Sequence, residues 1–336
     1  MMKSNIEELA EKIDNFSILI LGGTGLFAKE LIPKLTYYID KKNIKTKIYI
    51  TTRNKKKAVD FIPETKKSYV KFISIDFLLE NKIKDDINPK YVLHMATTSA
   101  NETYNNISQL SKFIVLKNST EALSKIIKRN QVKRVLLVSS GVAYGDIEVF
   151  KETHKSNLDN LDPKNSLAFG KLYSEFYLNS VCKLHNTELK IARCFSFISQ
   201  YLPLNIHYAV GNFVRDALCK EAIVIKSDGK DIRSYQDLSD CVEWLAFMLN
   251  KEFDYKMINV GSDESISILN LAKKIKSLLN PKAEIILKNE FMPDDNTRRR
   301  NYVPNLERAY ELGLSQKINL EESIIGLSEY IKKRGF

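Results

Sequence analysis

The chain has 336 residues, of which 44% are hydrophobic and 28% are charged, a composition typical of a folded soluble protein with one large domain or two of average size. No hydrophobic run reaches the length of about 20 residues that spans a membrane, and the polar, acidic start from Met1 to Glu8 is unlike a signal peptide. The formal charge of +11 is spread along the chain and often balanced by nearby Glu or Asp, so we expect neither nucleic-acid nor membrane binding.

The first 40 residues predict a helix, a strand and a second helix joined by a glycine turn. Residues 4–15 have helical spacing, 17–21 form a short apolar run, and 26–38 again have helical spacing. Gly22, Gly23 and Gly25 lie between the strand and the second helix. Glycines allow close approach of a ligand, and the helix N-terminus attracts negative charge. This pattern predicts a pyrophosphate site with Gly22, Gly25, Leu26 and Phe27 as contacts.

The next strand, residues 47–52, ends at Arg53 and is followed by Lys55 to Lys57. A carboxylate at this place favours NAD, because it accepts a hydrogen bond from the adenosine 2′-hydroxyl, whereas an arginine favours the 2′-phosphate of NADP. The sequence therefore predicts NAD or NADP as cofactor and slightly favours NADP. The alternative is that Arg53 is a surface arginine.

Three further strands, at 70–75, 91–96 and 132–138, end in residues suited to ligand binding. Alternation of strands and helices predicts an α/β fold with a Rossmann-like, doubly wound parallel sheet. Ligands of such sheets bind at the carboxyl ends of the strands. We therefore expect these strand ends beside the glycine turn: Asp76, Phe77, Ala96, Thr97 and Ser140.

The rest of the chain predicts helices at 106–129, 166–185 and 238–250, strands at 189–193 and 257–261, and a less regular stretch at 197–235. Two helices, 267–279 and 320–333, follow. We expect a dinucleotide-binding domain of residues 1–196 with about 236–260. A smaller C-terminal α/β substrate-binding domain then comprises 197–235 and 261–336.

The four cysteines lie far apart and form no CxxC pair. They are typical of reduced thiols in a cytosolic protein. We therefore expect a cytoplasmic location and no metal site.

Three segments together resemble the extended short-chain dehydrogenases/reductases, and in particular the NAD(P)-dependent epimerases and dehydratases of nucleotide sugars. They are the glycine turn 22–28, the strand end 92–96 with its His-Met-Ala, and residues 139–145 with Ser-Ser and Tyr-Gly. The resemblance implies that Ser140 is the active-site hydroxyl and that Lys171 is the catalytic lysine, which also holds the cofactor ribose.

The resemblance extends into the C-terminal part of the chain. Asn212 matches the segment that approaches the nucleotide and sugar, and Arg233 lies in a Gly-x-x-x-Arg-Ser-Tyr segment. Arg300, at the end of an arginine triplet, matches a second arginine of the family. The resemblance implies that Asn212, Arg233 and Arg300 bind a nucleotide-diphosphate sugar, and guanidinium groups suit a diphosphate because they bind its oxygens bidentately.

The sequence departs from the family at the catalytic tyrosine. The family motif Tyr-x-x-x-Lys, counted back from Lys171, places Leu167 at the tyrosine position. Leucine cannot transfer a proton, and Tyr144 and Tyr173 do not replace it without a change of geometry. The acid–base pair of the family dehydratases is also replaced, by Gly141 and Val142.

Two hypotheses follow. The first is an enzyme that carries out 4-keto reduction or epimerisation of a nucleotide sugar by hydride transfer at C4, in the synthesis of surface polysaccharide precursors. The second is a catalytically impaired paralogue that binds the cofactor and the nucleotide sugar. The resemblance also implies a homodimer through a four-helix bundle of helices 106–129 and 166–185. Its apolar stripe is expected from Tyr173, Phe176, Tyr177 and Val181, unless these side chains pack within the monomer.

Overall fold

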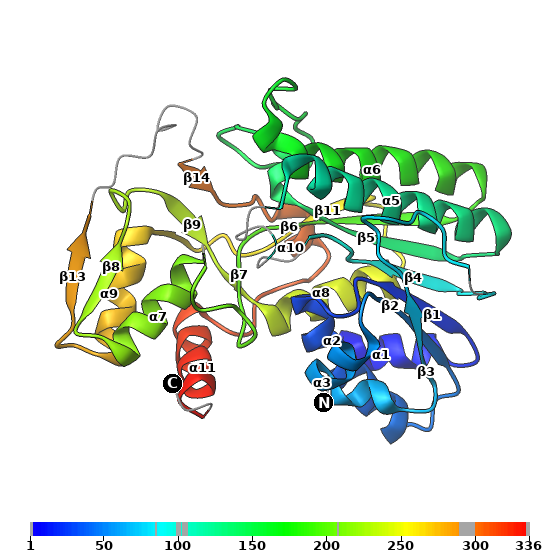
Figure 1. Ribbon diagram of the computed structural model, residues 1–336, viewed down its shortest axis with the longest axis horizontal. Coiled ribbons are helices and arrows are strands. Elements are labelled where there is room, and N and C mark those ends of the chain that lie inside the picture. Colours follow the sequence, from blue (N-terminus) through cyan, green and yellow to red (C-terminus); the bar gives the residue numbers. More distant parts are fainter. Residues whose placement is uncertain are drawn as a thin grey trace. The chain divides into compact units, whose positions relative to one another are not determined.

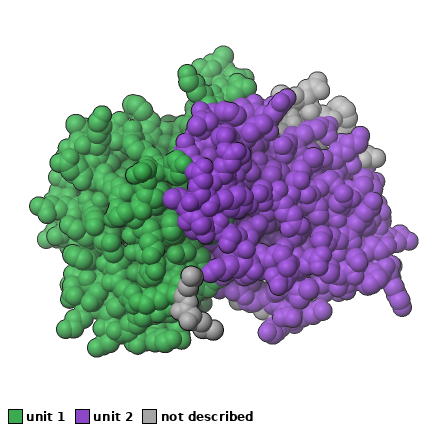
Figure 2. All heavy atoms as spheres, turned by 180° about the vertical axis from the view of Figure 1, so that it is seen from behind, with its two compact units in different colours: residues 1–145, 155–194, 242–258 green, residues 146–154, 195–241, 259–336 purple. Residues whose placement is uncertain are grey.

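The computed structural model describes residues 3–84, 86–98, 102, 107–206, 208–288 and 300–333. The chain divides into two compact units, which are coloured separately in Figure 2. Unit 1 comprises residues 1–145, 155–194 and 242–258, and unit 2 comprises 146–154, 195–241 and 259–336. Each unit is described by itself.

Unit 1 is built on a seven-stranded sheet (Figure 1) with the order β11-β6-β5-β4-β1-β2-β3. Neighbouring strands from β6 to β3 pair in parallel. Strand order reverses between β1 and β4, which creates the switch point where such sheets bind ligands. The predicted Rossmann-like fold is therefore confirmed. The strands are β1 (Ser17–Leu21), β2 (Lys47–Thr52), β3 (Val70–Ser74), β4 (Tyr91–His94), β5 (Arg134–Ser140), β6 (Glu188–Cys194) and β11 (Met257–Val260), whose last two residues belong to unit 2.

The helices of unit 1 bury one face each against the sheet or against one another. They are α1 (Asn5–Lys12), α2 (Leu26–Lys41), α3 (Lys55–Phe61), α5 (Gln109–Arg129), α6 (Ser166–Leu184) and most of α8 (Leu238–Asn250), with short 3₁₀ turns η1 (Pro63–Lys66), η2 (Gly141–Tyr144) and η3 (Pro163–Asn165). Ser4 and Ser108 cap the N-termini of α1 and α5 by accepting hydrogen bonds from backbone N–H groups.

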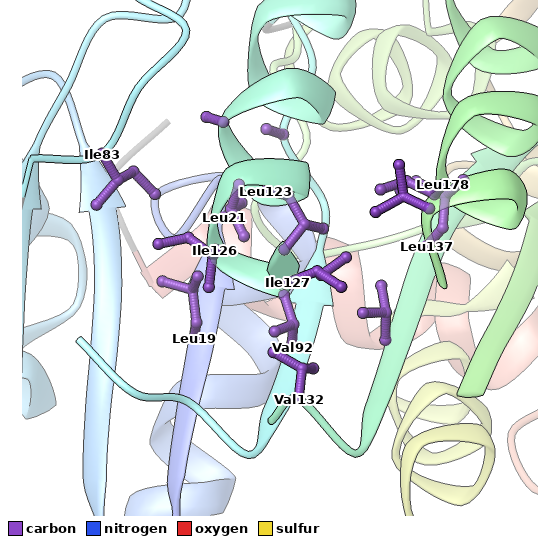
Figure 3. Packing of buried hydrophobic residues seen from close by; sticks show 14 of the residues in the cluster. Leu19, Leu21, Ile83, Val92, Leu123, Ile126, Ile127, Val132, Leu137 and Leu178 are labelled. Carbon is purple, nitrogen blue, oxygen red and sulfur yellow. The ribbon is translucent and has the colours of Figure 1, made fainter. Parts of the chain in front are cut away.

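The core of unit 1 forms where α5 and α6 pack on the sheet. Figure 3 shows Leu19 and Leu21 of β1 and Val92 of β4 in one cluster with side chains of α5, namely Leu123, Ile126 and Ile127. Burial of such aliphatic side chains contributes roughly 1.5–3 kcal/mol each.

Helices α5 and α6 lie side by side, and Gly170 permits their close approach. A Cβ atom at Gly170 would lie 2.5 Å from Cδ1 of Leu116 on α5. A side chain at this position of α6 would therefore require Leu116 to move.

Unit 2 contains short sheets and four helices in its described residues. Strand β9 (Ile232–Ser234) pairs with β12 (Ser265–Ser267) and β14 (Asn301–Tyr302), β8 (Ala222–Ile225) with β13 (Glu284–Leu287), and β7 (Phe197–Ile198) with β10 (Gln236–Asp237). The helices are α7 (Ala209–Cys219), α9 (Ile268–Leu279), α10 (Glu307–Glu311) and α11 (Leu320–Lys333). The stretch 197–235, expected to be less regular, thus includes α7 and β8.

None of the described helices is both long enough and hydrophobic enough to cross a membrane.

Candidate functional site

The first two glycines of the turn after β1 are crowded by neighbouring atoms. Gly22 has a φ of +83°, and a Cβ atom there would lie 2.8 Å from the backbone of Ala96. At Gly23, a Cβ atom would lie 2.0 Å from Cγ2 of Ile50. The turn is fixed to β2, because the N–H of Gly22 donates a 3.0 Å hydrogen bond to Oγ1 of Thr51. The turn and the end of β4 thus pack backbone against backbone.

Helix α2 starts at this turn with Gly25 as its N-cap, and no described side chain forms a hydrogen bond to that cap. Leu26 and Phe27 are its first residues and are half-buried. An N-terminus without a carboxylate or hydroxyl cap suits a bound phosphate, which the helix dipole attracts. The cradle of Gly22 and Gly25 therefore fits the pyrophosphate of a dinucleotide.

The ends of β2, β3 and β4 carry the other residues predicted for this ligand. Arg53 follows β2 and forms an ion pair with Glu102, a residue of the segment after β4. Asp76 follows β3, and its side chain accepts a 2.9 Å hydrogen bond from the N–H of Leu78. Thr97 after β4 is exposed. The ion pair of Arg53 was not foreseen, because the two residues are 49 positions apart.

Phe77 and Ala96, also predicted as cofactor contacts, are buried. Phe77 belongs to the hydrophobic cluster of unit 1, and its carbonyl accepts a 2.8 Å hydrogen bond from Asn118 of α5. Ala96 is 3% exposed and packs against the Gly22 turn. Ala96 shapes the turn by being small, whereas the Phe77 side chain contributes to the core.

Ser140 and Lys171 are both positioned by β5. Ser140 ends the strand, and its hydroxyl oxygen accepts a 3.3 Å hydrogen bond from the N–H of Val142. Lys171 is buried, and its ammonium group donates a 2.8 Å hydrogen bond to the carbonyl oxygen of Val138. Burial lowers the pKa of Lys171 to about 8, while the acidic groups of Cys194 and Glu175 act in the opposite direction. A lysine whose pKa lies close to neutral pH can bind and release a proton.

A buried ion pair supports Lys171 from one turn further along α6. Glu175 accepts hydrogen bonds from Arg193 of β6, of 3.0 Å from Nε and 2.6 Å from Nη2. Ser139 donates a 2.5 Å hydrogen bond to the same carboxylate. The guanidinium of Arg193 also lies 4.2 Å from the ring centre of Tyr144. The sequence alone did not reveal this network, although Glu175 lies four residues after Lys171.

His94, at the end of β4, is buried beside this cluster. Neither ring nitrogen has a hydrogen-bond partner among the described residues. Burial, together with the positive charge of Lys171, lowers the pKa of His94 to about 3. The imidazole is therefore neutral at physiological pH.

The two alternative tyrosines both contact other side chains of unit 1. Tyr173 stacks on Tyr177 at 5.4 Å and donates a 3.3 Å hydrogen bond to Glu121 of α5. Burial and the charge of Glu121 raise the pKa of Tyr173 to about 12. Tyr144 is fully buried under Arg193. Leu167 remains half-buried in the first turn of α6.

In unit 2, Arg233 and Arg300 lie together because β9 and β14 are paired. Nη1 of Arg233 donates a 3.2 Å hydrogen bond to the carbonyl of Arg300. Arg300 pairs with Asp228 at 2.9 Å, and Arg233 with Asp231 at 3.4 Å. The prediction that these arginines share one site is consistent with this contact.

Asn212 lies on α7, and its amide donates a 2.6 Å hydrogen bond to the carbonyl of Ile206. The predicted arginines 298 and 299 lie outside the described residues. No cluster of three or more metal-binding side chains is found in the described part of the chain.

Comparison with known proteins decides the family. The model of the NAD dependent epimerase/dehydratase family matches residues 18–261. The chain belongs to this family. The predicted resemblance to extended short-chain dehydrogenases/reductases is therefore confirmed.

Similar members of the family act on UDP-sugars, according to their names. The chain is 27% identical to UDP-glucuronic acid decarboxylase 1 of Danio rerio, over 98% of this chain and 75% of that protein. Among solved structures, an epimerase of Methanothermobacter thermautotrophicus has a TM-score of 0.79 at 20% identity, covering 98% of this chain and 96% of the other. The UDP-glucuronic acid 4-epimerase of Bacillus cereus, in complex with UDP-glucuronic acid and NAD, has a TM-score of 0.74 at 17% identity, covering 95% and 99%.

Proposed function

We propose that this member of the epimerase/dehydratase family modifies a nucleotide-diphosphate sugar by hydride transfer at C4, as an epimerase or a 4-keto reductase. The observation that carries the proposal is that the glycine cradle follows β1 and Ser140 ends β5, both at the carboxyl ends of parallel strands of unit 1, while the buried Lys171 of α6 donates a hydrogen bond to β5. The names of the relatives favour a UDP-sugar as the substrate. Supply of surface polysaccharide precursors in the cytoplasm is the role that we propose.

In this proposal each unit binds a different ligand group. Unit 1 holds the nicotinamide dinucleotide, with its pyrophosphate at Gly22 and Gly25. Unit 2 holds the diphosphate of the sugar nucleotide through Arg233 and Arg300, whose planar guanidinium groups match phosphate oxygens. Asn212 lies on α7 of the same unit and contributes to the sugar nucleotide site.

A bound nicotinamide dinucleotide would supply hydride transfer to or from C4 of the sugar. The C4 hydroxyl proton would move to or from an acid–base group. Ser140 orients the C4 oxygen by hydrogen bonding. Lys171 binds the ribose hydroxyls, and its positive charge stabilises negative charge on the reacting oxygen. Leu167 cannot exchange the proton, so water or Lys171 itself acts as the acid–base group. General acid–base assistance contributes roughly 10²–10⁴-fold to a rate.

The second candidate function is a cofactor- and nucleotide-sugar-binding paralogue without turnover. The observation that favours it is the leucine at position 167, combined with the contacts of Tyr144 with Arg193 and of Tyr173 with Glu121. Such a protein would retain the binding residues of both units and act as a regulatory or partner subunit.

One set of measurements separates the two candidates. Ligands that co-purify with the protein are identified by mass spectrometry, and turnover of UDP-glucose and UDP-glucuronic acid is followed through the absorbance of the reduced cofactor and by product analysis. The Leu167→Tyr variant restores a phenol one helical turn before Lys171. The matched control, Phe169→Tyr, adds the same phenol to a different face of α6.

Turnover by the wild type supports the enzyme, and we then expect Leu167→Tyr to raise the rate by about 10²-fold or more while Phe169→Tyr leaves it unchanged. Turnover that appears only in Leu167→Tyr supports the binding paralogue. Failure of the wild type to bind either a nicotinamide dinucleotide or a UDP-sugar contradicts both.

A further inference from the structure

Arg53 and Glu102 form an ion pair that connects two sides of the candidate dinucleotide site. Arg53 follows β2, and Glu102 belongs to the segment after β4. These strands are the two neighbours of β1 in the sheet. The pair therefore joins a residue that follows β2 to one that comes after β4, on either side of the strand that carries the glycine turn.

The electrostatic surroundings of Arg53 are acidic. The hydrogen bond from Arg53 to Glu102 and the negative charges of Glu102 and Asp76 raise the pKa of the guanidinium, although partial burial opposes this. Two carboxylates thus act on one guanidinium. Its positive charge is already balanced before any ligand binds.

Two of the lysines that follow Arg53, Lys55 and Lys57, lie near aromatic rings. The ammonium group of Lys55 lies 5.8 Å from the ring centre of Phe72, and that of Lys57 lies 5.8 Å from the ring centre of Phe61. Both are therefore directed to aromatic rings of β3 and α3. The groups shown to act on the pKa of Arg53 are the two carboxylates.

We propose that Glu102 supplies the carboxylate that selects NAD over NADP, in place of the acidic residue that β2 lacks. This inference rests on the proposed function, since it assumes that Arg53 lies beside the adenosine ribose. It opposes the slight preference for NADP that Arg53 alone suggested.

The physical reason is the difference between a hydroxyl and a phosphate at the ribose 2′ position. A carboxylate accepts a hydrogen bond from the 2′-hydroxyl of NAD. The same carboxylate repels a 2′-phosphate and occupies the guanidinium that would bind it. Removing the charge of Glu102 leaves Arg53 available for the phosphate.

The test is titration of NADH and NADPH, each followed by ligand fluorescence, into the wild type and the Glu102→Gln variant. We expect the wild type to bind NADH at least about tenfold more tightly than NADPH. Glu102→Gln should lower the Kd for NADPH about tenfold and change that for NADH by much less. Its NADPH affinity should also fall as salt is added, because the new contact is between charges.

Two further variants isolate the effect. The double variant Arg53→Gln/Glu102→Gln should not show the increase in NADPH affinity, because the 2′-phosphate then has no guanidinium partner. Glu11→Gln is the matched control: Glu11 pairs with Lys3 and Lys42 at the ends of α1 and α2, so this change raises the net charge equally but should leave the NADH-to-NADPH ratio unchanged.

A wild type that prefers NADPH, or a Glu102→Gln variant with an unchanged ratio, overturns the inference and leaves the proposed function intact. A wild type that binds neither dinucleotide overturns the proposed function and, with it, the inference.

Discussion

Leu167 lies one helical turn before Lys171 on α6, so an apolar side chain and a buried ammonium group share one face of the helix. The lysine therefore has no phenol at the preceding turn of its own helix. Its hydrogen bond goes to the carbonyl of Val138 instead. The burial of this ammonium group affects the electrostatic stability of the unit.

Lys171 should make stability depend on alkaline pH. Its pKa is about 8 in the folded state against 10.5 for the free side chain, so between these pH values the unfolded chain binds more protons than the folded one. The free energy of unfolding should therefore rise with pH across this window, by at most about 1.4 kcal/mol per pH unit, and the cost of burying the charge is fully present below pH 8.

Urea unfolding of the wild type and Lys171→Met at several pH values measures this effect as the difference between the two proteins. Lys117→Met, on the exposed side of α5, serves as control and should follow the wild type. A Lys171→Met variant with the same pH dependence as the wild type would contradict the prediction.

Replacement of Gly22 by alanine should abolish dinucleotide binding and destabilise unit 1. The new Cβ would lie 2.8 Å from the backbone of Ala96, in addition to the strain of a positive φ. Gly313→Ala is an informative control, because Gly313 has a similar φ of +76° but no described atom within 4 Å of the place that a Cβ would take. We expect it to cost only about 1–2 kcal/mol and to leave NADH binding unchanged.

Titration with NADH and thermal unfolding of both variants separate crowding from backbone strain. Equal effects of Gly22→Ala and Gly313→Ala on binding would show that the turn is not a ligand cradle.

Glu175→Gln should destabilise the protein strongly, because it leaves the buried Arg193 without a charged partner. Removal of one member of a buried ion pair costs about 3–5 kcal/mol. Glu80→Gln removes a carboxylate from the exposed pair with Lys84 and should cost less than about 1 kcal/mol. Chemical denaturation of the two variants gives the comparison, and similar losses for both would rule out a structural role for the buried pair.

The predicted homodimer can be tested on the exposed face of α6. Phe176 is 72% exposed there, an unusual position for a large apolar side chain unless a second subunit covers it. Phe176→Glu should convert a dimer to a monomer in sedimentation velocity. Leu79→Glu changes a side chain that is 79% exposed elsewhere in unit 1 and should not. A monomeric wild type would refute the four-helix bundle.

The sheet of unit 1 was predictable because each of its central strands is a short apolar run followed by a turn. Ile18 to Leu21 are all fully buried, and local hydrophobicity is sufficient to reveal such strands. In unit 2, α7 mixes polar and apolar residues, and β8, which follows two residues later, is a run of only four apolar residues. The same local patterns therefore did not distinguish them from irregular chain.

The site residues were predictable where a single position carries the chemistry, as for Gly22 and Lys171. They were not predictable where two distant residues act on each other. Glu102 neutralises Arg53 across 49 positions, and Arg193 pairs with Glu175 across 18. Val181 shows the same limit, because it was assigned to a subunit interface but packs in the core of its own subunit.

The close contact of Gly170 with Leu116 also bears on how this protein can change. A Cβ atom at position 170 would lie 2.5 Å from Cδ1 of Leu116, so a larger residue there requires Leu116 of α5 to move. Three residues earlier, Leu167 is only half-buried in the first turn of the same helix. The helix thus combines a position restricted by the neighbouring helix with one that is partly open to solvent. A phenol at position 167 therefore needs one amino-acid replacement and no change at the contact of Gly170 with Leu116.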